Sequence, residues 1–68
     1  MTKRQAYQKL ELYGLTEGYL YQYETGGWNA ASVDSSVGKN LRDHGMIDVD
    51  LNMKPKTFER VTIAHNDK

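Results

Sequence analysis

The apolar residues at the start of the chain follow the pattern of an amphipathic helix. They recur at three- and four-residue spacing, which places them on one helical face: Ala6, Tyr7, Leu10 and Tyr13. Thr2 and Gln5 have the spacing of a capping box, in which the two side chains reciprocally satisfy free backbone amides at a helix start. Gly14 supplies the left-handed residue that commonly ends a helix. The pattern therefore predicts a helix over residues 3–13.

The next segment, residues 15–27, fits two kinds of element. Its tyrosines alternate as in a strand: Tyr19, Tyr21 and Tyr23. Tyr19, Leu20 and Tyr23 also share one helical face, and Thr16 before Glu17 favours a helix start. The Gly26-Gly27 pair ends the element in either case. We predict a short helix over residues 19–24, with a strand as the alternative.

A second helical pattern follows Trp28. Val33, Val37 and Leu41 lie at four-residue intervals, and Gly45 follows as a terminator. Ser32 is a good N-cap, although Asn29 could start the helix one turn earlier. We predict a helix over residues 32–44.

The last third of the chain alternates apolar and polar residues, as half-buried strands do. The pattern predicts strands over residues 47–51 and 57–64, joined by a loop over residues 52–56 that holds the single Pro, so that the chain ends in a β-hairpin. Residues 65–68 are expected to form a frayed tail. The apolar stripes of the second helix and the hairpin are predicted to be buried together: Val33, Val37, Leu41, Ile47, Val49, Val61 and Ile63.

Length and composition limit the function classes. A chain of 68 residues has room for one domain, which we place at residues 1–64. It contains no Cys, no signal peptide and no apolar run of the roughly 20 residues that a membrane span needs, so we expect a cytoplasmic protein without membrane contact. His44, Asp48 and Asp50 lack the spacing of a metal site, and no nucleophile or acid–base pair indicates an enzyme. We expect no metal and no cofactor.

Residues 32–64 resemble a winged helix-turn-helix domain of bacterial and phage transcription regulators. The resemblance is carried by residues 35–47, SSVGKNLRDHGMI, in which small polar residues precede a Leu, a Gly and an apolar pair. It implies an α+β fold, a small winged helix-turn-helix with two or three helices followed by a C-terminal β-hairpin wing. It also implies a small regulatory protein that places the helix at residues 32–44 in the major groove of duplex DNA.

The resemblance and a helical wheel together give the candidate DNA contacts. Opposite the apolar stripe of helix 32–44 lie Ser35, Lys39 and Arg42, with Ser36 on the flank. The predicted hairpin adds three cations: Lys54, Lys56 and Arg60. However, nine Lys and Arg residues against nine Asp and Glu residues give a net charge of zero, so the chain as a whole has no basic excess.

Neutral charge and abundant aromatic residues favour an alternative function. The chain would then be a protein-binding module, such as a phage-type inhibitor or adaptor, that contacts a protein partner through four aromatic residues: Tyr19, Tyr21, Tyr23 and Trp28. For the DNA-binding hypothesis, a homodimer through helix 3–13 and the Tyr-rich segment would cover apolar surface and let two recognition helices meet successive major grooves. Acidic residues interleaved with the cations on the folded surface would favour this protein-binding hypothesis over DNA binding.

Overall fold

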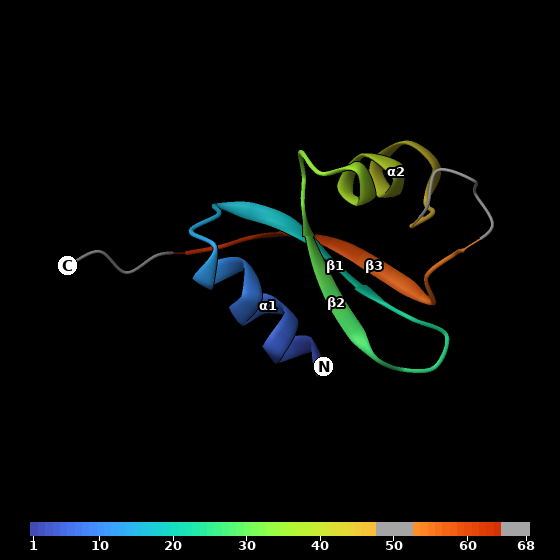
Figure 1. Ribbon diagram of the computed structural model, residues 1–68, viewed down its shortest axis with the longest axis horizontal. Coiled ribbons are helices and arrows are strands. Elements are labelled where there is room, and N and C mark those ends of the chain that lie inside the picture. Colours follow the sequence, from blue (N-terminus) through green and yellow to red (C-terminus); the bar gives the residue numbers. More distant parts are fainter. Residues whose placement is uncertain (48–52, 65–68) are drawn as a thin grey trace.

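The computed structural model describes residues 1–47 and 53–64, which form an α+β fold (Figure 1). Its elements follow in the order α1 (Lys3–Leu12), β1 (Glu17–Gln22), β2 (Trp28–Ser32), α2 (Ser36–His44) and β3 (Thr57–Thr62). The three strands form one antiparallel sheet in the order β2-β1-β3. The α+β class is as predicted, but the order of helices and strands differs from a winged helix-turn-helix.

Helix α1 begins where the capping-box pattern predicts. The Thr2 hydroxyl accepts from the Gln5 amide at 3.2 Å, and the Thr2 amide donates to the Gln5 side chain at 2.9 Å. The helix ends at Leu12, and Gly14 follows with φ of 74°, in the left-handed region that favours glycine. This helix was therefore readable from local sequence alone.

The segment predicted as a short helix over residues 19–24 is instead strand β1, so the helix prediction was wrong and the strand alternative is confirmed. Leu20 is buried on one face of the sheet, and Tyr19 and Tyr21 are buried on the other. A strand is buried on both faces in this way when a helix covers each face of the sheet. Successive side chains then pack alternately under one helix and under the other. Because a β-hairpin precedes α2, the described chain lacks the helix that a helix-turn-helix motif needs there.

Helix α2 begins four residues later than predicted. Ser32, expected as its N-cap, is the last residue of β2, and its carbonyl accepts from the Ser35 amide at 3.1 Å in the turn between the two elements. Ser35 is the N-cap: its hydroxyl accepts from the Gly38 amide at 3.0 Å. Gly45 ends the helix in the left-handed conformation, with φ of 69°, as predicted.

Strand β3 lies at the predicted place, and among the described residues its partner is β1. The pairing aligns Glu17 with Thr62 and Gln22 with Thr57. Of the predicted partner strand, residues 48–51 lie outside the described residues, as does the predicted tail at 65–68. The Ile47 amide donates to the Met53 carbonyl at 2.9 Å, which brings these two ends together.

The helices cover opposite faces of the sheet, so the core has two parts (Figure 1). The part under α1 consists of Ala6, Leu10, Leu20, Ala30 and Ile63. The part under α2 consists of Tyr19, Tyr21, Leu41 and Ile47. The predicted single core is thus divided by the sheet: Val33 and Val37 pack at the edge of the α2 part, and Val61 at the edge of the α1 part. Val49 lies outside the described residues.

Glycine at position 38 lets α2 approach β2 closely. A Cβ atom on Gly38 would overlap the Ser32 carbonyl oxygen at the end of β2. Glycine weakens a helix, and this close backbone contact explains why it nevertheless occupies position 38 in the first turn of α2. Within the part of the chain that the structure describes, neither helix is long and apolar enough to cross a membrane.

Candidate functional site

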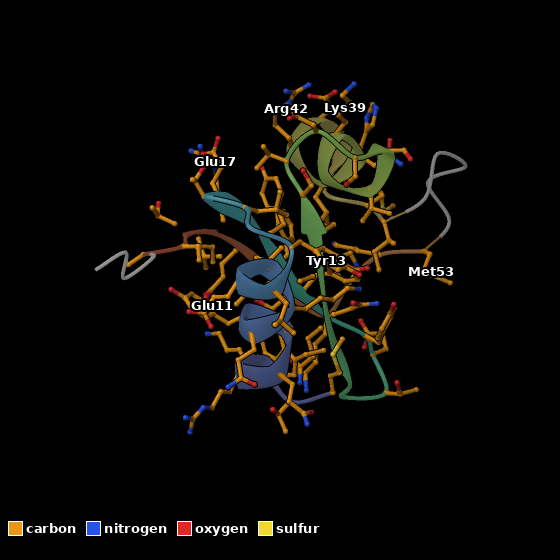
Figure 2. All side chains as sticks on the ribbon, turned by 60° about the vertical axis from the view of Figure 1, so that its left-hand side comes forward. Glu11, Tyr13, Glu17, Lys39, Arg42 and Met53 are labelled. Carbon is orange, nitrogen blue, oxygen red and sulfur yellow. The ribbon has the colours of Figure 1, made fainter. Side chains whose placement is uncertain are left out.

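The predicted DNA contacts on α2 are exposed, but one of them is engaged by an acid. Figure 2 shows Lys39 and Arg42 on the outer side of the helix, pointing away from the sheet. The Arg42 guanidinium donates to both carboxylate oxygens of Asp43, at 2.8 and 3.3 Å. These hydrogen bonds lower the pKa of Asp43 and raise that of Arg42. The serines differ: Ser35 caps the helix, and Ser36 is exposed at its first position.

The predicted cations near β3 are exposed as well. Lys54 and Lys56 are exposed on the segment that leads into β3, and Arg60 lies on β3, where it forms an ion pair with Glu17. Arg42 and Arg60 line a common cleft of about 350 Å³. The same cleft is lined by two acids and two apolar residues: Glu17, Asp34, Tyr19 and Val33. Acids are therefore interleaved with the predicted DNA contacts.

The predicted aromatic interface is largely core. Tyr19 and Tyr21 are buried, so they offer no contact surface, and the tyrosine half of the predicted dimer surface is lost with them. Burial raises the pKa of Tyr21. The Tyr21 and Tyr23 rings pack edge to face, with their centres 5.6 Å apart. Tyr23 and Trp28 are half-buried; Lys3 Nζ lies 5.3 Å from the centre of the Trp28 ring.

At the outer edge of β2, three backbone groups are hydrogen-bonded within the chain itself. In the register with β1, the outward backbone groups of β2 belong to Trp28, Ala30 and Ser32. The Trp28 amide donates to the Met1 carbonyl at 2.9 Å, and the Ala30 amide donates to the Asn29 side chain at 2.8 Å. The Ser32 carbonyl accepts from the amide and the hydroxyl of the N-cap serine of α2. No further strand can add at this edge without breaking these bonds.

The outer edge of β3 is different. The Ile63 amide donates to the Thr16 carbonyl at 2.8 Å, and alternation along the antiparallel register then turns the backbone of Glu59 and Val61 toward β1. The backbone groups of the intervening residues point outward: Phe58, Arg60 and Thr62. Within residues 1–47 and 53–64, these outward amides and carbonyls have no hydrogen-bond partner.

The side chains of β3 are as accessible as its backbone. All of its residues are exposed except Val61, which is half-buried against the α1 part of the core. Phe58 is 39% exposed. Its ring packs at a tilt against the Tyr19 ring, with the two ring centres 6.2 Å apart. Exposed backbone groups and an exposed aromatic ring thus occur together on one strand. The sequence located this strand correctly, but the edge position depends on pairing with β1, which no local pattern shows.

Comparison of the chain with models of known protein families, with curated proteins and with solved structures finds no match.

Proposed function

We propose that the chain is a protein-binding module that takes up an extended segment of another protein as a strand beside β3. The observation that carries the proposal is the contrast between the two edges of the sheet: three outward backbone groups of β2 are bonded within the chain, whereas none of the outward groups of β3 has a partner among the described residues. Unpaired strand edges of this kind are templates for strand addition, in which backbone hydrogen bonds supply affinity and alternate side chains supply specificity.

The charges of the described surface favour a protein partner over duplex DNA. A DNA-binding face neutralises phosphates with cations that have no protein partner. Two of the predicted DNA contacts, Arg42 and Arg60, are instead paired with Asp43 and Glu17. Asp34 joins Glu17 as the second acid that lines the cleft shared by the two arginines. DNA binding by α2 stays a prediction, and it is the competing outcome of the experiment below.

Charge also favours a different chain over a second copy of this one. If β3 paired antiparallel with β3 of a second copy, the residues whose backbone groups point outward would have to hydrogen-bond to each other. Only two registers satisfy this condition and still overlap almost the whole of both strands. One places Arg60 opposite Arg60 of the copy. The other places Glu59 opposite Glu59 of the copy. Like charges directly opposite each other destabilise a strand pair, so both registers are disfavoured.

The test is a pull-down from a lysate of the source cell with and without nuclease, using two substitutions at one position. Arg60→Pro removes an outward amide and leaves the bonds between β3 and β1 in place, whereas Arg60→Ala removes only the side chain. We expect a protein that is captured after nuclease treatment, retained by Arg60→Ala at least in part, and lost with Arg60→Pro. Circular dichroism checks that both variants fold.

Two results would contradict the proposal. Capture that Arg60→Pro leaves unchanged would show that the edge of β3 is not used. Capture that nuclease abolishes, and that falls equally with Lys39→Ala and Arg42→Ala, would favour the DNA-binding function of α2 instead.

A further inference from the structure

We infer that the segment bound at β3 carries an apolar residue flanked at two-residue spacing by acidic residues, in the pattern acid-x-apolar-x-acid. This inference rests on the proposed function and specifies its partner. Side chains at alternate positions of an added strand lie on the same face of the sheet as the residues opposite them. Phe58 and Arg60 both lie on the α2 face, since Phe58 meets Tyr19 and Arg60 pairs with Glu17. The flanking and central residues of the pattern would share that face.

The central apolar residue is specified by Phe58. The ring leans against Tyr19 on one side, and Gly45 at the end of α2 lies close to it. The surface of Phe58 remains partly exposed on this edge strand. An apolar side chain directly opposite would cover this surface, and aromatic or β-branched partners give the most favourable cross-strand pairs.

The first acidic residue is specified by Arg60. Its side chain is 61% exposed although it pairs with Glu17, and that ion pair engages one guanidinium nitrogen, Nη2. A guanidinium carries five N–H donors, so the remaining N–H groups can donate to a second carboxylate. A carboxylate opposite Arg60 would thus meet a preformed partner.

The second acidic residue is specified by the cations that precede β3. Lys56 and Lys54 are exposed, and within the described residues neither forms an ion pair. Lys56 lies two residues before Phe58, so an acid two positions from the apolar residue would approach it. The pattern reads the same in both directions and therefore holds for a parallel or an antiparallel segment.

The opposite face of β3 restricts where the acids can lie. Glu59 points to the α1 face, where it pairs with Lys3 at 3.0 Å. An acidic residue opposite Glu59 would meet a like charge. The two intervening positions of the partner are therefore neutral or basic, and the acids alternate with them rather than forming a continuous run.

The experiment is selection of binders from a random peptide library on the intact protein, followed by affinity measurements on the enriched peptides. We expect enrichment of acid-x-apolar-x-acid, about a tenfold loss of affinity with Arg60→Ala, and a larger loss with Arg60→Pro. Arg4→Ala, which removes an exposed cation from α1, is the matched control and should leave affinity unchanged. With Lys56→Glu, the same selection should replace one acid by a basic residue.

The outcomes separate this inference from the function on which it rests. Enriched peptides that are lost with Arg60→Pro but lack the acidic pattern would overturn the inferred chemistry and leave strand addition standing. Enriched peptides that bind Arg60→Pro as well as the parent protein would overturn both. No enrichment at all would also overturn both, because an open edge with an exposed aromatic ring should select binders from a random library.

Discussion

The two outer strands of the sheet are held in different ways. Strand β2 is packed by both helices, and three of its outward backbone groups are bonded to Met1, Asn29 and the start of α2. Strand β3 is held chiefly by β1, and its outward groups are unpaired among the described residues. The same sheet thus has one edge that contributes to stability and one that is available for recognition.

The difference shows how a small domain can keep an open edge without pairing with itself. Edge strands carry a risk of aggregation that charged side chains reduce. In β3 the adjacent residues Glu59 and Arg60 disfavour both well-aligned antiparallel self-pairings. They do not disfavour a segment with complementary charges. Under the proposed function, charge on the outer edge of β3 selects which segment can bind there.

The largest expected effect is at the closed side of the sheet. Gly38→Ala should destabilise the protein by about 3 kcal/mol or more, because the added Cβ would overlap the backbone at the end of β2. Gly27→Ala is the control, since a Cβ there has its nearest neighbour at 3.9 Å. Denaturant unfolding measures both. Equal stability of the two variants would show that α2 does not lie this close to β2.

The next effect compares a core residue of α2 with an exposed residue of β3. Leu41→Ala should destabilise the protein by about 2 to 5 kcal/mol, since this α2 side chain is fully buried against the sheet. Phe58→Ala on β3 should cost about 1 kcal/mol, because much of that ring is exposed already. Urea unfolding of both variants measures the difference. A larger loss for Phe58→Ala than for Leu41→Ala would mean that β3 is covered in the folded protein.

A smaller effect tests the closure of β2. The Asn29 side chain accepts from the Ala30 amide and from Lys9 Nζ at 2.9 Å, and it donates to the Tyr23 hydroxyl at 3.2 Å. Asn29→Ala should therefore cost about 1 to 2 kcal/mol by leaving these groups unpaired. Gln22→Ala, which removes one exposed hydrogen bond, is the control. A cost no greater than that of the control would show that Asn29 does not close the edge.

The smallest effect concerns β1, between the two edges, at alkaline pH. The pKa of Tyr21 is raised in the folded protein by burial, so the stability that its neutral form contributes is present below the unfolded pKa of about 10. This stability is lost as the pH rises above that value toward the folded pKa. Unfolding free energy should fall above about pH 10 in the parent and less steeply in Tyr21→Phe. Identical slopes would contradict burial of this hydroxyl.

Local signals in the sequence predicted the elements that local interactions determine. The capping box at Thr2, the left-handed Gly45 and the strand that contains Val61 all lie where predicted. The tyrosine segment could not be assigned in the same way, because alternation and helical spacing coincide from Tyr19 to Tyr23. The choice depends on two helices covering opposite faces of the sheet, which is a tertiary effect.

The candidate site was predictable only in part. Arg60 was predicted from its charge as a DNA contact, which stays a prediction, and the structure places it on the edge strand β3, where it pairs with Glu17. The edge itself results from pairing between β1 and β3, which are far apart in the sequence. The prediction that Tyr19 and Tyr21 form a contact surface was wrong, because both side chains are buried. In a small domain, tyrosine occurs both in the core and in binding surfaces, so the residue type alone could not distinguish the two.

The most direct test of the open edge is residue-by-residue amide hydrogen exchange in the free protein, measured by NMR. The Arg60 amide should exchange at least about tenfold faster than the amides of Glu59 and Val61, which point to β1. The Ala30 amide on β2 should be protected by its bond to Asn29. Protection of Arg60 equal to that of Glu59 and Val61 would show that the outer edge of β3 is already paired, and would contradict the account.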